Sequence, residues 1–162
     1  MKNLKSVAYH EAGHAVARCI FNHPFHTVRI WKQGQPTGEM MLVKPDKPSE
    51  MTSKQLEEEI IISMAGPLAA SVCEGEISNN QVPDDDIQSI HEFRAWMLFN
   101  EGELSNITKY APSNDGDYIA SMDLKARNLI DEYWNAIIVT AEALLTYEML
   151  TMTEIENLIH LN

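Results

Sequence analysis

The sequence predicts a mainly helical α+β fold, formed by residues 1–162 as a single domain, with a small antiparallel β-sheet. Apolar residues recur at helical spacing through most of the chain. One short region, residues 27–43, has instead the alternation and the turn residues of a strand pair. No repeat, low-complexity tract or linker divides the sequence, and its 162 residues are an ordinary length for one domain.

The N-terminal third is expected to hold one helix and two strands. Apolar or small residues fall at helical spacing from about Leu4 to Phe21. Thr27–Trp31 alternates and is rich in β-branched residues, Gln33–Gly38 carries turn residues, and Glu39–Val43 is apolar. We therefore expect an antiparallel strand pair directly after the first helix.

The second helix is predicted from its start signal. Thr52 with Gln55 three residues later resembles a capping box, and the apolar pattern that follows runs to about Cys73. Pro67 lies inside this stretch and has no backbone N–H, so we expect a kink or break around Gly66 and Pro67.

The remaining helices are expected after a polar segment. The acidic triplet at residues 84–86 predicts the start of a third helix, because carboxylates favour a helix N-terminus. Residues 101–117 lack periodicity and predict a loop. One long helix is expected from about Tyr118 to Met149, and a short last helix capped by Thr153 and Glu156.

Composition excludes several function classes. The chain has 12 Lys and Arg against 24 Asp and Glu, a formal charge of -12, which repels nucleic acid and anionic membranes alike. It has no signal-peptide core and no apolar run that could span a membrane, so we expect a cytoplasmic protein. Cys19 and Cys73 lie in apolar helical stretches and are expected to be reduced thiols.

A metal-binding motif lies inside the first predicted helix. His10, Glu11 and His14 form an H-E-x-x-H pattern. Four residues advance a helix by about 400°, so both imidazoles project from one face and can bind one zinc ion. Glu11 lies beside them, where its carboxylate can take a proton from a water activated by the metal. The spacing and the residue types predict a zinc peptidase with Glu11 as the catalytic base.

A catalytic zinc site needs a third protein ligand, and the residues alone leave several candidates. The metzincin extension is excluded, because Ala17 and Ile20 stand where that subclass has glycine and histidine. The open candidates are two histidines after the helix, a glutamate run on the second helix and the acidic triplet: His23, His26, Glu57, Glu58, Glu59 and Asp86.

Four segments carry a resemblance to a known family. They are residues 7–16 (VAYHEAGHAV), residues 28–30 with 38–40, residues 64–66 with Ala69, and residues 83–87. Through them the chain resembles the peptidase domain of the FtsH-type ATP-dependent zinc proteases, a helical zincin-like domain. The resemblance implies Zn²⁺ as cofactor, with His10, His14 and Asp86 as ligands. It also implies polypeptide substrates, which pair with the strand that contains Gly38, Glu39, Met40 and Met41.

The sequence departs from this family in two ways. Pro67 replaces an arginine, and Ala70 and Ser71 replace an acidic pair, so the support around the metal ligands is expected to differ. The sequence also has no G-x-x-x-x-G-K-[ST] phosphate loop, so we expect this chain to cleave unfolded or flexible polypeptides without using ATP itself. The alternatives are a pseudoprotease that binds polypeptides without cleaving them, and a protease subunit that serves a separate ATPase or assembles as a homo-oligomer.

Overall fold

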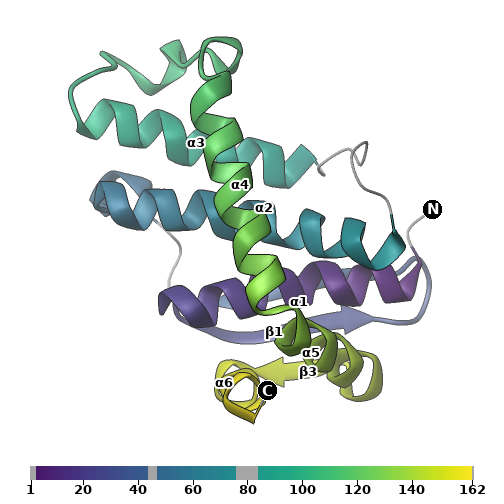
Figure 1. Cartoon of the computed structure of the whole chain (residues 1–162). Coiled ribbons are helices and arrows are strands. Elements are labelled where there is room, and N and C mark those ends of the chain that lie inside the picture. The colour runs from purple at the N-terminus through teal and green to yellow at the C-terminus, as the bar shows by residue number, and fades with distance from the viewer. Residues whose placement is uncertain (1–2, 44–46, 76–83, 162) are drawn as a thin grey trace.

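The computed structural model describes residues 3–43, 47–75 and 84–161. Figure 1 shows three helices stacked in parallel layers, α1 (Leu4–Phe21), α2 (Ser53–Glu74) and α3 (Asp84–Asn100), with the sheet against the far side of α1. This arrangement confirms the mainly helical α+β fold, and it places the predicted metal-binding helix between the sheet and α2.

Helix α1 begins and ends where the apolar pattern predicts. The Asn3 side chain accepts a hydrogen bond from the Ser6 N–H (2.7 Å), and Asn22 ends the helix in the left-handed conformation (φ 58°). Its buried residues lie on several sides, because α1 packs against α2, the sheet, α5 (Trp134–Tyr147) and α6 (Met152–Leu161). An apolar helix that is covered on several sides provides a rigid support for the residues it carries.

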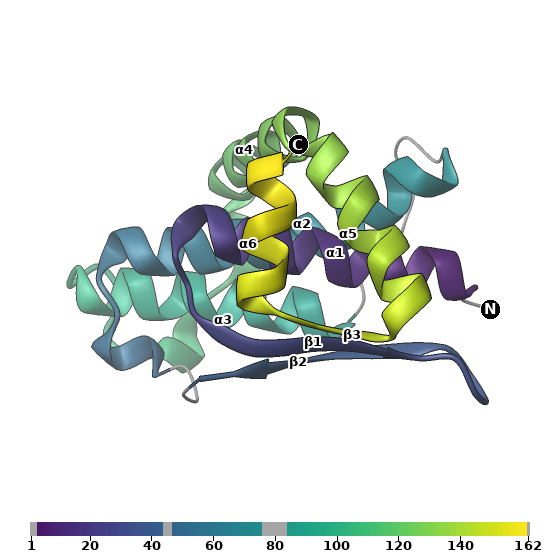
Figure 2. The same ribbon diagram turned by 90° about the horizontal axis from the view of Figure 1, so that it is seen from below.

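The sheet has three antiparallel strands in the order β2-β1-β3. Strands β1 (Phe25–Trp31) and β2 (Thr37–Leu42) are the predicted pair, and β3 (Met149–Thr151) was not predicted. Figure 2 shows the sheet lying across α1 with β2 at its edge. Within the described ranges no strand pairs with the outer edge of β2.

Of the kink or break expected around Gly66 and Pro67, the break is absent. The capping box of Thr52 and Gln55 is present as predicted, but α2 continues through Pro67 without interruption. Proline removes one backbone hydrogen bond from a helix, and α2 compensates through its packing between α1 and α3. The third helix starts on the acidic triplet, as predicted.

The C-terminal third differs most from the sequence prediction. The expected helix from Tyr118 to Met149 is two helices, α4 (Gly116–Glu132) and α5, which meet at Tyr133. The last helix is capped by Thr151 and Glu154 rather than by Thr153 and Glu156. The expected loop contains two short 3₁₀ helices, Ile107–Lys109 and Pro112–Asn114, and ends where α4 begins.

No helix in the part of the chain that the structure describes is both long enough and apolar enough to cross a membrane.

Candidate metal centre

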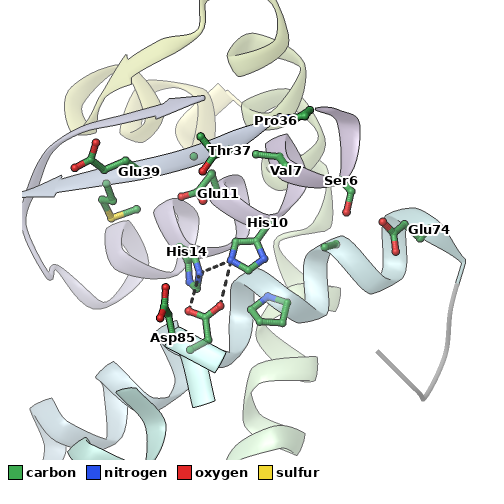
Figure 3. A pocket seen from close by; sticks show the side chains of 15 residues that line it. Ser6, Val7, His10, Glu11, His14, Pro36, Thr37, Glu39, Glu74 and Asp85 are labelled. Carbon is green, nitrogen blue, oxygen red and sulfur yellow. Dashed lines mark hydrogen bonds and ion pairs between the residues drawn. The ribbon is translucent and has the colours of Figure 1, made fainter. Parts of the chain in front are cut away.

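His10 and His14 lie one turn apart on α1 and point to the same place. Their Nε2 atoms are 3.0 Å apart, and the two rings meet edge to face with centroids 4.6 Å apart. Figure 3 shows both imidazoles directed into the space between α1 and α3. The helical spacing alone produces this convergence, as the motif predicts.

Asp86 completes the group from the first turn of α3. Its Oδ2 lies 3.2 Å from Nε2 of His10, and its Oδ1 lies 3.4 Å from Nε2 of His14. The three side chains each offer one ligand atom, and these atoms lie within 4.8 Å of one another. All the third-ligand candidates that the sequence leaves open lie among the described residues. Of these candidates, only Asp86 lies beside the two histidines.

The spacing of the three groups fits a zinc ion. Ligand atoms at about 2.05 Å from a tetrahedral centre lie about 3.3 Å from one another. The two histidine Nε2 atoms are 3.0 Å apart, and the two oxygens of Asp86 lie 3.2 Å from His10 and 3.4 Å from His14, so the groups are close enough to share one ion. Two imidazoles and one carboxylate are a donor set typical of a catalytic zinc site that leaves one position for water or substrate.

Two residues of α2 fix the His14 ring. Nδ1 of His14 donates to the Ile62 carbonyl oxygen at 2.8 Å, which leaves Nε2 as the ligand atom. Gly66 lies against the other side of the ring, where a Cβ would collide with Nε2. His14 is therefore oriented by the α2 backbone rather than by positions 70 and 71, where Ala70 borders the site and Ser71 donates to the Pro67 carbonyl.

The mutual charges of the group shift its pKa values. Burial raises the pKa of Asp86, but hydrogen bonds from His10 and His14 and their charge outweigh it and hold this pKa well below its usual range. Burial lowers the pKa of His14, but Asp86, Glu11 and the Ile62 carbonyl outweigh it and raise that pKa. Asp86 is thus ionised at neutral pH.

Glu11 lies beside the histidines and beneath β2. It is 9% exposed and lines a cleft of about 480 Å³ together with His10, His14 and Asp86. A Cβ at Gly38 would collide with the Glu11 side chain, so the absence of a side chain at Gly38 lets the carboxylate approach the strand. Figure 3 shows Glu11 between the two histidines and the strand.

The predicted substrate strand forms one wall of the same cleft. Gly38, Glu39 and Met40 line it, whereas Met41 does not and its side chain is 59% exposed on the opposite face of the sheet.

The other ligand candidates are engaged elsewhere. His23 contacts Glu58 and Glu59, each at 2.6 Å, beyond the far end of α1. Glu57 pairs with Lys125, and His26 is exposed on β1.

The family model described as peptidase family M41 matches residues 1–117 of this chain. The chain belongs to peptidase family M41. The resemblance seen in the sequence is thereby confirmed, and M41 membership supports a metallopeptidase domain.

Curated relatives of this M41 domain are named ATP-dependent zinc metalloproteases. FtsH 2 of Methylacidiphilum infernorum is 25% identical over 96% of this chain, and FTSH 9 of Oryza sativa is 24% identical over 99%. FtsH of Ruminiclostridium cellulolyticum is 30% identical over 79%. The aligned parts cover only 28%, 22% and 21% of these relatives, so the chain spans about a quarter of their length.

Three features of the M41 site were not predicted from the sequence. They are the Ile62 carbonyl behind His14, the contact of Gly66 with the same ring, and the contact of Gly38 with Glu11. A backbone carbonyl leaves no trace in a sequence. Gly66 does leave one, because it interrupts a helical stretch in which glycine is unfavourable, whereas Gly38 reads as a turn residue.

Proposed function

We propose that this M41 domain is a zinc-dependent endopeptidase in which His10, His14 and Asp86 bind the metal and Glu11 is the general base and then the general acid. The observation that carries the proposal is the convergence of three ligand atoms beside a largely buried carboxylate. All four side chains border one cleft next to an exposed strand edge. Residues of a merely structural zinc site have no need for a carboxylate at the Glu11 position.

Zinc, when bound, supplies a Lewis acid that polarises a carbonyl and acidifies a water molecule. The Glu11 carboxylate accepts the proton of the attacking water and later delivers it to the nitrogen of the leaving amine. The Ile62 carbonyl holds His14 in one tautomer during both transfers. The Gly38 backbone shields one side of Glu11 from solvent.

The outer edge of β2 is suited to pair with an extended polypeptide. Ile30 donates its N–H to the Glu148 carbonyl (2.9 Å), on the side of β1 away from β2. Gly38 is opposite Ile30 in the register, so the Gly38 backbone groups point away from β1, and those of Met40 do the same. A substrate strand can form hydrogen bonds with these groups and lay its scissile bond over the metal ligands.

The substrates are expected to be unfolded or flexible polypeptides, because only an extended segment can pair with a strand edge. The sequence has no phosphate-loop motif, so cleavage by this chain does not itself use ATP. Folded substrates would require an ATPase supplied from elsewhere.

Metal content and casein cleavage test the proposal together. We expect about one zinc per chain in the wild type and loss of zinc in His14→Ala and Asp86→Ala, with Asp85→Ala as the matched control on the same helical turn. Glu11→Gln should retain zinc and lower cleavage of unfolded casein by at least about a hundredfold. Zinc without cleavage would favour the polypeptide-binding pseudoprotease or the partner-dependent subunit, and absence of zinc would refute the metal site.

The strand-pairing step has its own test. Single N-methylation along a cleavable peptide should impair cleavage at every second position near the scissile bond, since alternate amides of a paired strand face β2. Equal effects at successive positions would contradict pairing with this edge, whatever the metal content.

A further inference from the structure

A small cavity lies beside the metal ligands, on the Leu42 side of β2. Its volume is about 230 Å³, and His14 and Asp86 form part of its wall. Met40 and Leu42 border it from the sheet and Phe93 from α3. A polypeptide that pairs with β2 directs alternate side chains to the face on which Met40 and Leu42 lie. The cavity is therefore placed to receive one substrate side chain next to the scissile bond.

A buried ion pair also lines this cavity. Arg18 donates to both carboxylate oxygens of Glu59, at 3.2 and 3.1 Å, and the two residues are 8% and 1% exposed. Arg18 lies one helical turn beyond His14 on α1, on the same face as the metal ligands. His23 contacts Glu59 from another side at 2.6 Å, which holds the carboxylate in place. The fork-to-fork geometry makes this pair rigid.

A second cavity of about 600 Å³ borders the same ion pair. Among the described residues that line the two cavities, Arg18 and Glu59 are shared and the others differ. Asn22, Val43 and Met51 line the second cavity and not the first. The ion pair is thus the partition between a small space beside the metal and a larger space behind it.

We propose that the Arg18–Glu59 pair is the floor of a substrate side-chain subsite and determines its specificity, limiting it to side chains of about leucine or methionine length. This inference rests on the proposed peptidase function. The apolar walls from Met40, Leu42 and Phe93 favour an aliphatic side chain. A tryptophan side chain needs more depth than a leucine or methionine side chain, so the floor excludes it.

The test compares the wild type with two double variants at residues 18 and 59, using inhibitors that bind the metal. Two series of peptide hydroxamates carry the test side chain, leucine or tryptophan, on opposite sides of the chelating group. Binding of each compound to the zinc-loaded protein is measured by calorimetry. In one series the wild type should bind the leucine compound at least about tenfold more tightly. Arg18→Ala with Glu59→Ala opens the partition and should reduce this ratio about tenfold. Arg18→Met with Glu59→Leu refills the floor without charge and should keep the ratio.

A milder variant guards against poor folding of the opened protein. Ser89 lines the small cavity from α3 and is only half-buried, so Ser89→Leu should fill the cavity and weaken the leucine compound while an alanine compound binds as before.

Each failure has a distinct reading. The role of the ion pair would be refuted if the wild type bound the leucine and tryptophan compounds equally. It would also be refuted if the folded, zinc-loaded double alanine variant kept the wild-type ratio of the two affinities. Neither result would contradict the metal site. If Arg18→Met with Glu59→Leu no longer preferred the leucine compound, charge rather than depth would select the side chain, and the proposal would likewise be refuted. A wild type that binds no zinc would refute the peptidase function and the subsite together, and metal analysis reveals this before any inhibitor is added.

Discussion

Helix α1 carries two polar clusters on one face. The metal cluster is His10 and His14 with Asp86, and the ion-pair cluster is Arg18 with Glu59 and His23. Both are largely buried and both join α1 to a neighbouring helix. In the ion-pair cluster the carboxylate faces the guanidinium donors of Arg18. In the metal cluster two imidazole nitrogens and a carboxylate converge on one point, where they could hold a cation.

This difference shows how a buried polar group can be assigned a role. A cluster whose charges cancel within the protein can hold the fold together without a ligand. A cluster whose ligand atoms point at each other needs something between them and is the stronger functional candidate. Substitutions in each cluster should therefore have separable effects on stability and on zinc.

The largest expected effect is on stability and comes from the ion-pair cluster. Arg18→Ala leaves the Glu59 carboxylate, which is 1% exposed, without its guanidinium partner. We expect the free energy of unfolding to fall by about 3 kcal/mol, measured by urea denaturation. Zinc stoichiometry of the folded fraction should not change. A variant with normal stability would contradict the ion-pair assignment, and loss of zinc would show that the clusters are not separable.

An intermediate effect is expected in the metal cluster. Gly66→Ala places a methyl group where Nε2 of His14 lies, so the ring must move. Zinc affinity, measured by competition with a chelator, should fall about tenfold to a hundredfold.

Two glycine controls sharpen this result. A Cβ at Gly116, the first residue of α4, meets nothing within 4 Å, so Gly116→Ala should bind zinc normally. Gly38→Ala displaces Glu11 instead of His14, so it should retain zinc and lose turnover. Equal zinc affinity in the Gly66 and Gly116 variants would mean that α2 does not orient His14.

The smallest effect is a pH dependence of stability at His23. Burial lowers the pKa of His23, but hydrogen bonds from the imidazole to Glu59 and Glu58 outweigh it and raise this pKa above 6.5. A raised pKa contributes stability that is fully present below the unfolded value and lost as pH rises through the folded value. The stability difference between wild type and His23→Gln should therefore be larger at pH 6 than at pH 9. A difference that grows toward high pH would contradict the assignment.

Local signals account for the parts of the fold that could be predicted. The metal helix needs only an apolar pattern and a cap at Asn3, and α2 needs only the Thr52 and Gln55 box. His10 and His14 could be paired because four residues make about one helical turn. Asp86 could be selected from the open candidates only through the family resemblance, because its approach to α1 depends on how α3 packs.

Long-range contacts account for the parts that could not be predicted. Strand β3 has three residues and exists through its pairing with β1, at the other end of the chain. Glu148 (φ 66°) turns the chain from α5 into that strand, although its sequence carries no turn signal. The boundary at Tyr133 likewise has no proline or glycine, so the apolar pattern continues across it. Tertiary packing, rather than local preference, determines these positions.

If Asp86 is the third ligand, as proposed, its position in the sequence affects when activity can begin. Asp86 follows His14 by 72 positions and reaches it only after α3 has packed against α2. A growing chain that has exposed its histidines therefore still lacks a complete metal site. On the proposed function, a chain in which α3 has not yet packed against α2 cannot cut other polypeptides.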